Sequence, residues 1–151
     1  MKPKKYMFRE ITSTKDNRYI ILIRLVVGLV FLSEGIQKFI FPEIRGPGRF
    51  ESIGLPAAEF FGYLVGGFET ICGILVLAGA YTRVAVIPLI VIMIVAILTT
   101  KIPVFIQNGF WEMAHAMRTD LSMLLCSLFL LARGGGSNSL DSRLSRKKLK
   151  P

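Results

Sequence analysis

The sequence has few of the side chains on which metal and disulfide chemistry depend. It contains two cysteines and one histidine, His115. Cys72 and Cys126 both fall inside apolar runs and form no Cys-x-x-Cys pair, so the sequence predicts neither a disulfide framework nor a metal site. A single histidine cannot ligate haem from both faces or build a zinc site. No phosphate-binding loop and no Ser/His/Asp set is recognisable either. We therefore expect no metal, haem or nucleotide cofactor.

Polar residues are also scarce, and their scarcity indicates a lipid environment. Hydrophobic residues make up 52% of the 151 residues, and the mean hydropathy is +0.55. A soluble domain of this length needs more polar residues to cover its surface. A membrane span takes about 20 apolar residues, and four segments approach or reach that length: 19–41, 59–80, 84–100 and 114–132. The sequence predicts an all-α, polytopic membrane four-helix bundle over residues 19–132.

The connections between these segments differ in kind. Residues 81–83 are expected to form a tight turn. The loop over residues 42–58 is rich in glycine and proline, so we expect it to be irregular and folded back on itself. The connection over residues 101–113 carries Phe105, Phe110 and Trp111, which is typical of a segment at the membrane interface.

The net charge of +9 lies entirely in the two terminal segments. Residues 1–18 hold six basic and two acidic side chains, and residues 133–151 hold six basic and one acidic, so residues 19–132 are neutral overall. Basic segments flanking an apolar body follow the positive-inside rule. We therefore expect a multi-pass membrane protein with both termini cytoplasmic. The basic charge favours anionic lipid headgroups over nucleic acid, and Gly134–Ser137 predicts a flexible C-terminal tail.

Several ionisable side chains lie at or inside the predicted spans, where each needs a partner or a function. With a helical rise of about 1.5 Å per residue, they lie about 17–26 Å from the cytoplasmic ends of their helices. They therefore share one layer in the outer half of the bilayer. The predicted polar pocket or buried ion-pair network consists of Glu34, Lys38, Glu69, Lys101, Arg118 and Asp120. Arg49, Trp111 and His115 are candidates for the rim of this pocket.

Glycines indicate which way Glu69 points. Gly62, Gly66 and Gly73 share one helical stripe with Glu69. Small residues mark close helix contact in membranes, so Glu69 should face the bundle interior. Gly28 and Gly35 form a similar stripe on the first helix.

The other charges are placed by their spacing. Glu34 and Lys38 are four residues apart and can pair on one helical face. Arg118 and Asp120 are two residues apart and point in nearly opposite directions, so which of them faces the interior stays open. Arg24, near the cytoplasmic end, is expected to extend its charge to the membrane surface.

A set of short motifs, in this order and spacing, resembles the DoxX family of small bacterial and archaeal membrane proteins. The motifs are Arg24 with Gly28–Phe31, Gly35–Phe39, Gly54–Pro56, Phe68–Glu69 with Gly73, Thr82–Arg83, and Arg118–Leu121. The resemblance covers the chain from Arg24 to Gly135. It implies a four-helix bundle in a prokaryotic cell (inner) membrane. The family takes its name from a subunit associated with a thiosulfate:quinone oxidoreductase, which implies a redox association. The absence of a paired cysteine counts against thiol exchange.

Three functions are compatible with these observations. The first is an accessory membrane subunit of a quinone- or sulfur-linked redox system, with a quinone or small substrate in the outer polar pocket and soluble or membrane redox subunits as partners. The second is a small-solute or proton-coupled transporter. The third is a membrane chaperone or scaffold whose polar core is purely structural. Whether the chain forms a homo-oligomer, and whether it catalyses a reaction, stays open.

Overall fold

The computed structural model describes residues 17–147, and within this range it contains helices and no strands. Four helical stretches are long and apolar enough to cross a membrane. They are α2 (Ile20–Ile40), α4 (Ala58–Ala78), the continuous stretch α5 (Thr82–Ala96), η1 (Ile97–Lys101) and α6 (Ile102–Asn108), and α7 (Phe110–Arg133). The predicted all-α membrane four-helix bundle is confirmed. Predictions for residues 1–16 and 148–151 lie outside the described residues.

Large apolar side chains cover the outer surfaces of these helices. Leu29 on α2, Ile71 and Ile74 on α4, and Val91 on α5 are all more than half exposed. A water-soluble monomer rarely exposes contiguous apolar surface on this scale. The exposed faces therefore match lipid, as the mean hydropathy predicted.

The third and fourth spans are longer than the sequence predicted. The expected loop over residues 101–113 is mostly helical, because η1 and α6 extend the third span to Asn108. Pro103 lies in the first turn of α6, directly after η1. The chain then reverses at Gly109, whose φ of +85° favours glycine, and α7 begins at Phe110 rather than at residue 114. The third span therefore ends after the predicted residue 100, and the fourth begins before the predicted residue 114.

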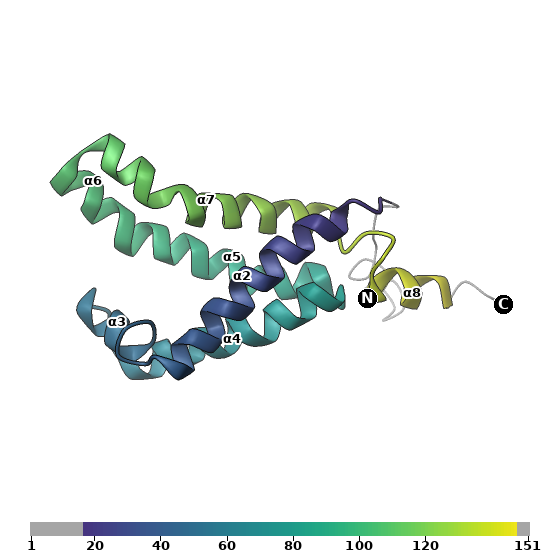
Figure 1. Ribbon diagram of the computed structural model, residues 1–151, viewed down its shortest axis with the longest axis horizontal. Coiled ribbons are helices and arrows are strands. Elements are labelled where there is room, and N and C mark those ends of the chain that lie inside the picture. The colour runs from purple at the N-terminus through teal and green to yellow at the C-terminus, as the bar shows by residue number, and fades with distance from the viewer. Residues whose placement is uncertain (1–16, 148–151) are drawn as a thin grey trace, which may run out of the picture.

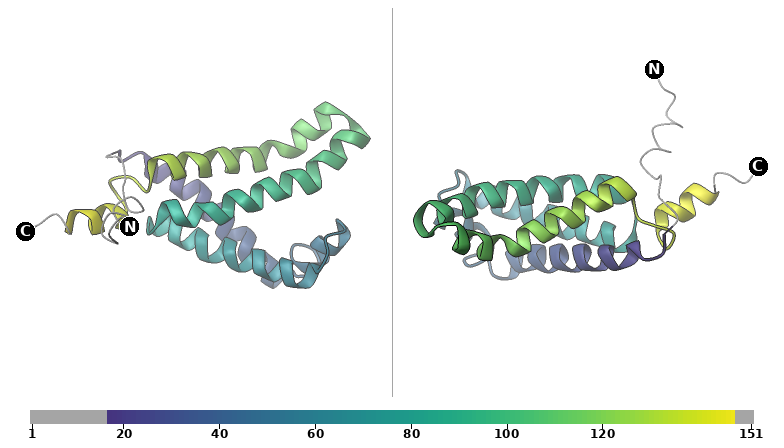
Figure 2. Two further views of the ribbon diagram at one scale, coloured as in Figure 1. Left: turned by 180° about the vertical axis from the view of Figure 1, so that it is seen from behind. Right: turned by 90° about the horizontal axis from the view of Figure 1, so that it is seen from above.

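The four spans form two antiparallel pairs, α2 with α4 and α5 with α7. The pairs meet where α2 begins and α7 ends, which we call the terminal end. They diverge toward the opposite end, which we call the far end (Figures 1 and 2). At the far end the short helix α3 (Pro47–Ser52) packs against α4, within the loop that was expected to fold back.

Glycines hold α2 and α4 together, as their stripes predicted. A Cβ atom on Gly35 would lie 2.6 Å from the backbone nitrogen of Thr70, and one on Gly73 would lie 2.8 Å from that of Leu32. Gly28 lies against Gly73 in the same way. The two backbones are therefore too close for any side chain at these positions, which is how small residues drive helix association in membranes.

Arg24 does not extend to the membrane surface as expected. It is 3% exposed, and its Nε donates to the carbonyl oxygen of Val76 at 2.9 Å. Its Nη1 donates to the carbonyl oxygens of Gly135 at 3.1 Å and Asn138 at 2.8 Å, and its Nη2 donates to that of Leu77. The last carbonyls of a helix have no partner within it. Arg24 supplies these partners and so joins α2, the end of α4 and the segment after α7.

The segment from Gly134 is not a flexible tail within the described residues. It leads into α8 (Leu140–Lys147), and Ser139, Asp141 and Ser142 are buried. The Asp141 carboxylate accepts hydrogen bonds from the backbone N–H groups of Tyr81 at 2.7 Å and Thr82 at 2.9 Å. Both N–H groups lie at the start of α5, where the backbone donors have no partner within the helix, and the residue at the N-cap makes no side-chain capping hydrogen bond. Asp141 therefore caps α5 from a distant part of the chain, and its charge suits the helix N-terminus.

Removal of Asp141 should destabilise the bundle. Asp141→Ala removes both hydrogen bonds to the start of α5, and loss of an N-cap costs about 0.5–2 kcal/mol. We expect a lower thermal unfolding temperature in detergent for Asp141→Ala, and a larger fall for a chain that ends after Gly136. A chain that ends after Lys147 keeps the cap and serves as the control. A chain ending after Gly136 that is as stable as this control would contradict the role of the cap.

Candidate functional site

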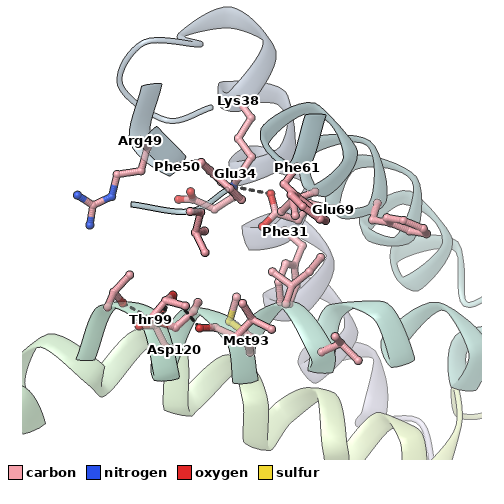
Figure 3. A pocket seen from close by; sticks show the side chains of 18 of the residues that line it. Phe31, Glu34, Lys38, Arg49, Phe50, Phe61, Glu69, Met93, Thr99 and Asp120 are labelled. Atoms are coloured by element: carbon pink, nitrogen blue, oxygen red, sulfur yellow. Dashed lines mark hydrogen bonds and ion pairs between the residues drawn. The ribbon is translucent and has the colours of Figure 1, made fainter. Parts of the chain in front are cut away.

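A cavity of about 860 Å³ lies between the two helix pairs toward the far end. One wall comes from α2 and α4, the other from α5, η1 and α7, and the α3 segment borders it (Figure 3). Its size falls within the range of about 300–1,000 Å³ that is typical of ligand sites. Most of its lining is apolar or aromatic, and includes Phe31, Phe61, Phe68, Val91 and Met93.

The first wall holds the ion pair between Lys38 on α2 and Glu69 on α4. Lys38 Nζ lies 2.6 Å from Glu69 Oε2, and the two side chains are only 10% and 3% exposed. Gly62, Gly66 and Gly73 are buried on the same face of α4 as Glu69. The glycine stripe therefore indicated the correct direction for this carboxylate.

The opposite wall holds a second ion pair, between Lys101 on η1 and Asp120 on α7. Lys101 Nζ lies 2.9 Å from Asp120 Oδ2. Lys101 ends a five-residue π-helix, Ile97–Lys101, and single π-helical turns within α-helices are frequent at functional sites. The π-helical turn changes the direction of every side chain after it, relative to a regular α-helix.

Asp120, not Arg118, faces the cavity. Arg118 is exposed on the outer side of α7, where its Nη1 lies 2.8 Å from His115 Nδ1. A helical side chain leans toward its own N-terminus, so the Arg118 guanidinium extends along α7 toward the far end. It can reach the membrane interface in this way. Arg118 therefore lies apart from the ion pairs with which the sequence analysis grouped it.

Glu34 lines the cavity. It does not pair with Lys38, although the spacing of the two residues had suggested that pair. Lys38 is engaged by Glu69 instead. Among residues 17–147, Glu34 has no ion pair and no side-chain hydrogen bond. It is half-buried and faces the cavity from α2 (Figure 3).

Of the three predicted rim residues, Arg49, Trp111 and His115, the structure places one at the cavity. Arg49 on α3 is exposed and borders the cavity, together with Arg45. Trp111 is 82% exposed at the start of α7, and neither it nor His115 borders the cavity. Trp111 stacks edge-to-face on Phe110 with a centroid distance of 5.3 Å, in the position of an interfacial aromatic residue.

The sequence analysis did not identify Arg45 or the hydroxyl side chains Thr99 and Thr100, which also line the cavity. Arg45 stands four residues before Arg49, a spacing that could have indicated it. The two threonines precede Lys101 directly, and their hydroxyls donate to the carbonyl oxygens of Val95 at 2.8 Å and Ala96 at 2.7 Å. The aromatic lining carries no sequence signal that separates it from ordinary packing.

Metal binding has no support in the part of the chain that the structure describes. No three His, Cys, Asp or Glu side chains in it gather where they could hold a metal ion. Cys72 on α4 and Cys126 on α7 are both free thiols. The polar groups that line the cavity are carboxylates, lysines, arginines and hydroxyl groups.

Comparison with known proteins agrees with this architecture. Residues 19–102 match the sequence model of the DoxX family. The chain belongs to the DoxX family. It is 58% identical over 134 residues to the "Uncharacterized membrane protein Rv3486" of Mycobacterium tuberculosis, covering 85% of this chain and 82% of that protein. It is 32% identical over 123 residues to the "Putative oxidoreductase CatD" of Bacillus subtilis, covering 80% and 83%. No solved structure matches the chain.

The Lys38–Glu69 pair gives a direct test of the site geometry. Glu69→Ala would leave Lys38 buried without its counter-ion, and breaking one partner of a buried pair typically costs about 3–5 kcal/mol. We expect a marked fall in the thermal unfolding temperature of the detergent-solubilised DoxX protein. The exchanged pair Lys38→Glu with Glu69→Lys should recover part of this loss. Glu112→Ala, at an exposed site, is the control. A Glu69→Ala protein as stable as this control would mean that the ion pair does not hold α2 to α4.

Proposed function

We propose that this DoxX protein is a non-catalytic membrane subunit of a quinone- or sulfur-linked redox system, and that its cavity binds a quinone headgroup. One observation carries the proposal. The cavity combines apolar and aromatic walls with an ion pair in each of two facing walls. A few fixed polar groups within a mainly apolar cleft are typical of sites for flat amphipathic ligands. The relative named as an oxidoreductase supports a redox association.

The residues of the cavity fit a quinone in chemistry as well as size. Phe31, Phe61 and Phe68 offer apolar surface to a flat ring. Lys38 and Lys101 each carry three N–H donors, and the ion pairs leave donors that can reach a carbonyl oxygen. A bound quinone would supply two-electron, two-proton chemistry, and the electrons would come from a partner redox subunit. The role of this chain would be to bind and orient the headgroup and to keep lipid tails from it.

We propose that both termini are cytoplasmic and that the cavity faces outward from a bacterial cell membrane. The terminal segments carry the whole net charge of +9. The far end carries Glu43, Glu51, Glu59 and Glu112 against Arg45 and Arg49. An excess of basic residues on one side favours the cytoplasmic location of that side. The polar layer then lies in the outer half of the bilayer.

A transporter is the second candidate. The observation that favours it is the asymmetry of the bundle, in which Arg24 and Asp141 close the terminal end while the cavity lies toward the far end. Such a shape would suit the outward-facing state of a carrier for small solutes. A scaffold with a purely structural polar core is the third candidate, and it requires no ligand.

Binding of a short-chain quinone tests the proposal. We expect saturable binding of a decyl-substituted benzoquinone to the protein in lipid nanodiscs, measured by isothermal titration calorimetry. Lys101→Gln should weaken binding by about tenfold or more, since a hydrogen bond to a charged group contributes about 1.5–3 kcal/mol. Arg118→Gln changes a basic residue outside the cavity and should leave binding unchanged.

Two results would contradict the redox proposal. The first is the absence of saturable quinone binding. The second is equal weakening by Lys101→Gln and Arg118→Gln, because the effect would then not arise in the cavity. Solute uptake by reconstituted vesicles in the absence of quinone binding would favour the carrier instead.

A further inference from the structure

The carboxylates and the lysines that face the cavity are unequal in number. Three carboxylates face it, Glu34, Glu69 and Asp120, and two lysines face it, Lys38 and Lys101. Each lysine is held by a carboxylate of the neighbouring helix at 2.6 or 2.9 Å. Glu34 is the carboxylate that remains. Among the residues that the structure describes, no side chain donates to it.

The remaining cations at the cavity do not compensate Glu34. Arg45 and Arg49 are exposed on the border of the cavity, and the Arg49 guanidinium extends away from Glu34 (Figure 3). A carboxylate beside apolar walls at membrane depth needs a hydrogen-bond donor. Since Glu34 faces into the cavity, that donor comes from what occupies the cavity, either water or a hydroxyl group of a bound ligand.

We propose that Glu34 accepts a hydrogen bond from a hydroxyl group of a bound hydroquinone, and that the cavity therefore binds the reduced form more tightly than the oxidised form. The inference rests on the proposed quinone site. The two oxygens of a quinone can only accept hydrogen bonds, whereas those of a hydroquinone can both donate and accept. Lys38 and Lys101 can donate to either form and do not distinguish them. Glu34 can bind only a donor, so it is the residue that discriminates.

A preference for the reduced form has a second consequence that can be measured. Tighter binding of the reduced form raises the reduction potential of the bound couple by linkage. For a two-electron couple a tenfold preference corresponds to about 30 mV. The binding ratio and the potential of the bound quinone should therefore change together when Glu34 is altered.

The test compares both redox forms of one probe on three proteins. The probe is the decyl-substituted benzoquinone and its hydroquinone, the latter kept under argon, with calorimetric titration of protein in nanodiscs. In the parent protein the hydroquinone should bind about tenfold more tightly or better, as a charge-assisted hydrogen bond allows. Glu34→Gln should lose most of this preference, because an amide can both donate and accept. Glu112→Gln makes the same change at an exposed site outside the cavity and should keep it.

The outcomes separate this inference from the proposed function. Equal binding of the two forms by the parent would overturn the role of Glu34 and leave the quinone site in place. A preference that persists unchanged in Glu34→Gln would also overturn it. No binding of either form would overturn the proposed function and this inference together. The unfolding temperature of Glu34→Gln, which breaks no ion pair, should match that of the parent and shows that the variant is folded.

Discussion

The hydrogen bonds of Arg24 fix the shape of the bundle. One buried guanidinium on α2 binds carbonyl oxygens at the end of α4 and in the segment after α7. Asp141 completes the same end by capping α5. All four spans are thereby held together at the terminal end. At the far end the two helix pairs diverge (Figure 1), and the cavity lies between them because nothing comparable joins them within the described residues.

Separate ion pairs make a polar layer tolerable inside the membrane. Lys38 and Glu69 join α2 to α4, and Lys101 and Asp120 join η1 to α7. Each ion pair neutralises the charges within its own wall of the cavity, so the two walls need no contact with each other for this purpose. A buried ion pair is weak evidence for stability by itself. Here two such pairs lie on facing walls, and Glu34 faces the cavity from α2 without a partner among the described residues. This arrangement is expected of a binding site more than of a packed core.

The parts of this structure that the sequence predicts are those encoded by local pattern. Apolar length located the four spans, and the glycine stripe gave the direction of Glu69. The rise per residue grouped the four residues that form the two ion pairs, although it did not predict that Lys101 pairs with Asp120. The parts that it did not predict depend on contacts between distant residues. Arg24 and Asp141 reach partners 52 to 114 and 59 to 60 residues away, which no local pattern encodes. The orientation of Lys101 also depends on the π-helical turn before it, which regular helical counting cannot anticipate.

Cysteine labelling from outside the cell can locate the cavity, which lies toward the end of the bundle opposite the termini. Thr99 lines the cavity, whereas Leu89 on the same span is fully buried. In a background with Cys72→Ala and Cys126→Ala, intact cells carrying Thr99→Cys or Leu89→Cys would be treated with a membrane-impermeant maleimide. If the cavity faces outward, Thr99→Cys is labelled from outside the cell and Leu89→Cys is not. Protection of both cysteines, or labelling of Thr99→Cys only from the cytoplasmic side, would contradict an outward-facing cavity.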